Sequence, residues 1–116
     1  PVFISIESNS GAIYDRIADA ITERIATGEI VQGQQLPAAR DLADALGLNV
    51  HTVLHAFQRL RDDGLVELRR GRGAVVIGAP AVQAVHEAVA AAVETARRTG
   101  VGVAALVALT RREYRA

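Results

Sequence analysis

Two short apolar stripes with helical spacing, separated by only three residues, constrain the fold of this chain most strongly. The linking residues are Gly47-Leu48-Asn49. Glycine favours the left-handed conformation that ends a helix, and asparagine is a preferred N-cap for the helix that follows. The sequence therefore predicts a helix-turn-helix over residues 38–63, a motif whose second helix enters the major groove of DNA. The stripes consist of Ala39, Leu42, Ala43, Leu46, Val53, Ala56, Phe57 and Leu60.

The residues before this motif predict a strand, a helix and a loop. A short β-branched run predicts a strand at residues 2–6, and an apolar period of four predicts an amphipathic helix over residues 12–27. Gly28 is placed to end that helix. Residues 29–37 lack a helical period, so we expect a loop whose Ile30, Val31 and Leu36 reach the core. The repeating positions of the helix are Ile13, Ile17, Ile21 and Ile25.

A hairpin is predicted directly after the motif. Residues 65–68 alternate in polarity and residues 74–77 regain strand character, while the segment 69–73 between them is rich in glycine and arginine. Such a tip projects its charged side chains into solvent. With the helices, the hairpin predicts a mainly α fold with a small β-hairpin wing, a winged helix-turn-helix domain over residues 1–78.

The remaining residues, 79–116, predict a C-terminal two-helix arm. One apolar stripe runs from 82 to about 98, Thr99-Gly100 interrupts it, and a second stripe starts at Val103. We expect the helices to form a hairpin with more apolar surface than it can cover. The stripe could pack on its own domain, but a protruding arm favours a dimer interface. The candidate interface residues are Val82, Val85, Val89, Val93, Val103 and Leu106.

Composition narrows the class of protein. A chain of 116 residues has room for one modest core and an appendage. The absence of cysteine excludes disulfides and thiolate metal sites, and no apolar run approaches the roughly 20 residues of a membrane span. We therefore expect a soluble cytoplasmic protein that binds neither membrane nor cofactor. Thirteen basic residues balance thirteen acidic ones, so a case for nucleic acid depends on where the charges lie.

Two groups of residues are candidates for DNA contact. The polar residues of the second motif helix lie off its apolar stripe, and side chains of these types bind base edges or phosphates. The arginines of the hairpin tip are candidates for phosphate contact. The helix candidates are Asn49, His51, Thr52, His55 and Gln58, and the tip candidates are Arg69, Arg70 and Arg72.

Simpler explanations exist for the same residues. His51 and His55 lie one helical turn apart and could form a metal pair, but no third ligand is evident nearby, so no metal site is predicted. The tip arginines could merely keep a strand edge soluble. Arg40 could pair with Asp44 on its own helix.

The ordered motifs closely resemble the signature of the GntR family over about residues 11–77, and the small arm resembles the YtrA-like subfamily. The resemblance implies DNA contacts by Arg40, by the face from Asn49 to His55 and by the wing from Gly71 to Gly73. The matching residues are Ile13-Tyr14-Asp15-Arg16-Ile17, Gly28-Glu29-Ile30, Gly33, Leu36-Pro37-Ala38-Ala39-Arg40-Asp41-Leu42-Ala43, Thr52-Val53, Ala56-Phe57, Leu60, Gly64-Leu65-Val66 and Arg70-Gly71-Arg72-Gly73.

This chain departs from the family pattern at three positions. Ala38 replaces a serine that would cap the first motif helix. Val50 and Leu54 stand where arginine is common in the family. The arginine that most members carry at position 50 reads bases, so the resemblance implies the family's docking geometry but not its base specificity.

The sequence therefore predicts a homodimeric, sequence-specific transcriptional regulator, a repressor that binds a pseudo-palindromic operator in double-stranded DNA. A winged helix that binds a protein partner is the alternative. An enzyme is not expected, because cysteine is absent and no carboxylate pair has a recognisable catalytic setting. The sequence does not identify a small-molecule effector.

Overall fold

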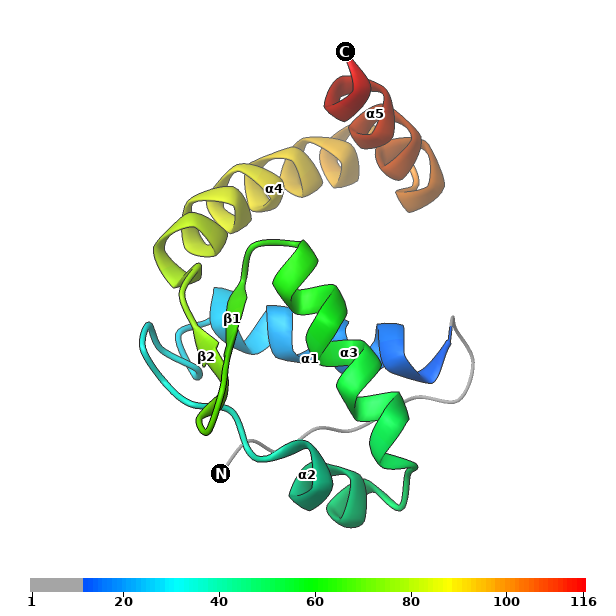
Figure 1. Cartoon of the computed structure of the whole chain (residues 1–116). Coiled ribbons are helices and arrows are strands. Elements are labelled where there is room, and N and C mark those ends of the chain that lie inside the picture. Colours follow the sequence, from blue (N-terminus) through cyan, green and yellow to red (C-terminus); the bar gives the residue numbers. More distant parts are fainter. Residues whose placement is uncertain (1–11) are drawn as a thin grey trace. The chain divides into compact units, whose positions relative to one another are not determined.

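The computed structural model describes residues 12–116, which form five helices and one two-stranded antiparallel sheet (Figure 1). The strand predicted at residues 2–6 lies outside the described residues. The fold class is confirmed: mainly α with a hairpin wing and C-terminal helices. The elements are α1 (Ile13–Ala26), α2 (Ala39–Leu46), α3 (Val50–Asp62), β1 (Val66–Arg69), β2 (Gly73–Val76), α4 (Ala79–Thr99) and α5 (Val103–Arg115).

The core of the domain lies where α1 and α2 pack against α3, with β1 beside α3. The isoleucine stripe of α1 supplies three fully buried side chains, Ile17, Ile21 and Ile25, and α3 supplies Val53 and Leu60. Burying a side chain of this size stabilises a fold by about 1.5–3 kcal/mol. This set of contacts holds α3 in place and leaves its other face exposed.

The turn between α2 and α3 is built as its sequence predicts. Gly47 ends α2 with φ of 68°, in the left-handed region that glycine adopts without strain. The side chain of Asn49 caps α3: its Oδ1 accepts a hydrogen bond of 2.8 Å from the backbone N–H of His51. These two caps fix the angle between the helices within three residues.

The loop from residue 29 to residue 37 is more ordered than its sequence suggests. It runs along β2, where Gln35 forms a bridge with Val75 and the backbone N–H of Leu36 donates to the carbonyl of Ala74 at 2.8 Å. Ile30 and Leu36 are buried as predicted. Val31 is 53% exposed, so its expected place in the core was wrong.

The contacts of the chain divide it into two units, with the boundary between Gln83 and Ala84. The boundary predicted from the sequence lies between residues 78 and 79. The first turn of α4 belongs to the first unit because Val82 packs on its core and Gln83 Nε2 donates to the carbonyl of Ile25 at 3.4 Å. Gln32 strengthens the junction, since its Oε1 accepts from the backbone N–H of Ala79 at 3.0 Å.

The second unit contains the rest of α4 and all of α5. A turn at Gly100, with φ of 83°, joins the helices, and the N–H of Val101 donates to the carbonyl of Ala96 at 2.8 Å. The two helices make few contacts with each other beyond this turn. No residue of α5 is buried. Within residues 12–116, no helix has the length and apolarity needed to cross a bilayer.

Candidate nucleic-acid interface

The recognition face of α3, its exposed side, carries His51, Leu54, His55 and Gln58. The opposite side of α3 carries the apolar residues that are buried in the core. Thr52 is half-buried, so less of it is available than of its neighbours. The period of the sequence predicted this division between a buried and an exposed face.

Asn49 has a structural role at the start of the same helix. Because its Oδ1 is used by the cap, only its amide nitrogen is left to donate to a DNA acceptor. A bidentate contact with adenine would need both ends of the amide. While α3 stays capped, Asn49 therefore offers DNA the N–H donors of its Nδ2 rather than both ends of the amide.

His55 lies at the edge of the recognition face, against α1. Its ring stacks on that of Tyr14, with centroids 3.8 Å apart and planes 14° from parallel. Tyr14 is partly buried and packs on the core. The stacked position fixes the ring of His55 and leaves His51 as the freer of the two histidines.

The wing is the hairpin of β1 and β2, with residues 70–72 at its tip. Arg69 pairs with Gly73 at the end of the ladder, and Gly71 has φ of 79°, a conformation that closes the tip in three residues. The Arg69 Nε lies 2.9 Å from Glu67 Oε1 in an ion pair. Arg70 and Arg72 are exposed, and no acidic side chain within residues 12–116 forms an ion pair with either.

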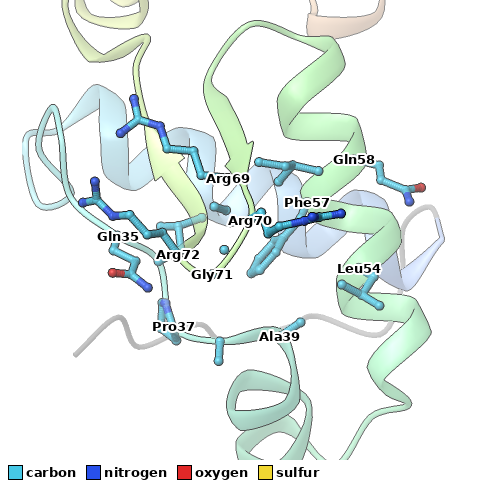
Figure 2. Close-up of a pocket in the computed structure, with 15 residues that line it drawn as sticks. Gln35, Pro37, Ala39, Leu54, Phe57, Gln58, Arg69, Arg70, Gly71 and Arg72 are labelled. Atoms are coloured by element: carbon cyan, nitrogen blue, oxygen red, sulfur yellow. The ribbon is translucent and has the colours of Figure 1, made fainter.

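A groove of about 500 Å³ lies between the wing, α3 and the start of α2 (Figure 2). Its floor is apolar, with Phe57 at the bottom and Leu54 on the α3 side. The tip of the wing supplies cationic groups at its rim. The remaining lining residues are Gln35, Leu36, Pro37, Ala38, Ala39, Gln58, Leu68, Arg69, Arg70, Gly71, Arg72, Gly73 and Ala74.

The groove brings together part of the predicted contact set. The wing residues 69–73 all line it, whereas Asn49, His51, Thr52 and His55 do not. Leu54 and Gln35 line it but were not among the predicted contacts. Leu54 stands where arginine is common in the family, but a leucine has no charge or hydrogen-bonding group that would predict a contact with DNA. Gln35 lies in a segment without a period.

Arg40 is exposed in the first turn of α2, just after Ala38 and Ala39 of the groove. It forms no ion pair with Asp44, the pairing expected of a purely structural residue, nor with any other acid in the described part of the chain. Ala38 is the N-cap of α2 and makes no side-chain cap bond. The first turn of α2 therefore offers a free cation beside its unsatisfied backbone N–H groups.

A cluster of charges on the other side of α3 is structural. The guanidinium of Arg59 binds Asp19 Oδ1 at 2.7 Å and Asp15 Oδ1 at 3.1 Å, and it also donates to the carbonyl of Asp15 at 3.0 Å. Asp63, the residue that follows α3, places its Oδ2 3.4 Å from Arg59 Nε. Burial alone would lower the pKa of Arg59, but the three carboxylates outweigh it and raise this pKa above its ordinary value. The cluster ties α3 to α1.

The candidate dimer residues are divided between the two units. Val82 packs on the core of the first unit. Val85 and Val103 are 63% and 76% exposed, Val89 is also exposed, and Val93 and Leu106 are half-buried. Five of the six predicted residues thus keep apolar surface in the second unit.

Among the curated relatives, two are similar to somewhat more than half of this chain. An uncharacterised HTH-type transcriptional regulator of Mycobacterium tuberculosis is 41% identical over 64 residues, which are 55% of this chain and 26% of that protein. The HTH-type transcriptional repressor YtrA of Bacillus subtilis is 34% identical over 68 residues, 59% of this chain and 52% of that protein. The chain therefore matches only a quarter to about half of the length of these relatives.

Solved structures share the fold. YtrA from Sulfolobus acidocaldarius, a GntR-family transcription factor, is 36% identical with a TM-score of 0.60, covering 76% of this chain and 97% of that one. The DNA-binding domain of AraR, solved in complex with operator ORR3, has a TM-score of 0.53 at 24% identity and covers 66% of this chain and 94% of that one. The model of bacterial regulatory proteins of the gntR family matches residues 13–76. The chain belongs to the GntR family of bacterial regulatory proteins.

Proposed function

We propose that this chain is a transcriptional repressor that binds an inverted-repeat operator in double-stranded DNA as a homodimer. The observation that carries the proposal is the groove, where the exposed side of a capped recognition helix meets Arg70 and Arg72 of the wing, neither of which pairs with an acid within residues 12–116. The AraR domain of the same fold was solved on an operator. A regulator of this kind acts on DNA in the cytoplasm.

The proposed binding mode follows from the geometry of the first unit. The exposed face of α3 would enter the major groove, where His51 and the free amide nitrogen of Asn49 can reach base edges. Arg70 and Arg72 would lie on the sugar-phosphate backbone, together with Gly71 and Gly73, whose lack of side chains permits close approach. Thr52, His55, Arg40 and Arg69 complete the proposed contact set.

The homodimer is proposed from the second unit. α5 has no buried residue, and the valine stripe of α4 stays exposed beyond Gln83. Apolar surface of this extent on two helices is typical of a protein interface. A two-fold dimer would present two recognition helices to half-sites separated by about one helical turn, roughly 34 Å. Repression is proposed because YtrA of Bacillus subtilis is a repressor.

Selection of binding sites from random duplex DNA tests this function. We expect an enriched inverted repeat, and we expect gel filtration of the complex to show two chains for each duplex. Transcription from a promoter that carries the repeat should fall when the protein is added. Enrichment without symmetry would contradict the dimer, and no enrichment at any salt concentration would contradict DNA recognition and favour a protein partner.

A further inference from the structure

Leu54 is an apolar residue on the otherwise polar recognition face of α3. Within α3, all of which the structure describes, it is the one large hydrophobic side chain that is exposed, at 41%. The other exposed positions of the helix are occupied by polar or charged residues. An apolar side chain facing water in the middle of a polar face gains stability when a partner covers it.

The surroundings of Leu54 favour an apolar partner of small size. It lines the groove together with Phe57 and with Ala39 of α2 (Figure 2). Phe57 is buried and presents only a small part of its surface there. Gln58 lies one turn further along the same face. The side chain of Leu54 thus stands between an apolar floor and a face suited to hydrogen bonding.

One group on the base edges of the major groove matches this chemistry. The C5-methyl of thymine is apolar, whereas the other groups presented there are hydrogen-bond donors and acceptors. We infer that Leu54 is a specificity-determining residue that recognises a thymine in each operator half-site by packing against its C5-methyl group. The inference rests on the proposed function, because it requires α3 to lie in the major groove.

Replacing single thymines with deoxyuridine tests the inference, since this change removes the methyl group and keeps the base pair. In the selected operator, one thymine of each half-site should lose about fourfold in affinity per half-site on this change, the effect of one buried methyl-sized group. With the Leu54→Ala protein the same replacement should have no effect. The Val31→Ala protein is the control: it trims an exposed side chain outside the groove and should keep the fourfold loss.

The outcomes separate the two claims. If the operator is bound but no deoxyuridine weakens binding, or if Leu54→Ala remains as sensitive as the unaltered protein, the inference is wrong and the proposed function stands. If no duplex is enriched at all, the proposed function fails and the inference fails with it. Thermal unfolding of the Leu54→Ala protein identifies any loss of binding that results from unfolding.

Discussion

The ring of His55 stacks on the ring of Tyr14, with their centroids 3.8 Å apart and their planes inclined by 14°. The contact joins the second turn of α3 to the first turn of α1. It places a residue of the recognition helix in direct contact with the helix that supports it. His55 is therefore a packing residue as well as a candidate for DNA contact.

Removing either ring should weaken the fold, and removing both should cost less than the sum of the single changes. Stacked aromatic pairs are coupled by about 0.5–1.5 kcal/mol, which a double-mutant cycle of Tyr14→Ala and His55→Ala measures by urea denaturation. Tyr114→Ala is the control, because Tyr114 is 93% exposed. Strict additivity of the two changes would show that the stacking contributes no stability.

Arg59→Met should lower the free energy of unfolding by about 1–3 kcal/mol, since it removes charged hydrogen bonds that join α3 to α1. Arg61→Met is a matched control whose ion pair is with its neighbour Asp62 on an exposed surface. The pKa of Arg59 is higher in the folded protein than in the unfolded chain. The stability that its charge contributes is therefore complete at any pH below the unfolded-state pKa, and it is lost only as pH rises through the folded-state pKa. The difference between the Arg59 variant and the unaltered protein should therefore stay constant across neutral pH. Equal effects of the two variants would contradict the structural role of Arg59.

Gly78→Ala should destabilise the first unit by about 1–3 kcal/mol because of overpacking. A Cβ atom at this position would lie 2.5 Å from the carbonyl oxygen of Gly64 and 3.1 Å from the Cα of Leu65, both of them backbone atoms. Gly102→Ala is the control, since a Cβ there meets nothing within 4 Å. Thermal unfolding of the two variants compares them, and equal midpoints would show that the chain has room at Gly78.

Val89→Asp should convert the proposed dimer into a monomer, because it places a charge on the exposed apolar stripe of α4. Ala91→Asp adds the same charge on the other side of the helix, given a rotation of about 100° per residue. We expect sedimentation equilibrium to show a monomer for the first variant and a dimer for the second. A dimer that survives Val89→Asp would mean that another surface joins the chains.

Much of the fold was predictable because its signals are local. The isoleucine period of α1, the glycine at the end of α2 and the asparagine that caps α3 each act within a few residues, and all three are found as predicted. The bridge from Gln35 to Val75 was not predictable, because it joins residues 40 positions apart that carry no pairing signal. The boundary of the first unit likewise depends on Gln83 reaching α1.

The candidate site was predictable in its elements and less so in its details. Periodicity identified the exposed face of α3, and the glycines identified the tip of the wing. Sequence alone could not show that Glu67 pairs with Arg69, or that Tyr14 lies against His55, because each depends on how side chains meet in three dimensions. The place of Leu54 in the groove was missed for the same reason.

The dependence of operator binding on salt tests the central claim most directly. The slope of log affinity against log salt changes by about 0.9 for each phosphate contact, so Arg70→Ala with Arg72→Ala should make it shallower by about 3–4 in a dimer. Arg97→Ala with Arg98→Ala removes the same charge from the end of α4 and should leave the slope unchanged. A slope that the wing variant does not alter, or that both variants alter equally, would contradict DNA binding by the wing.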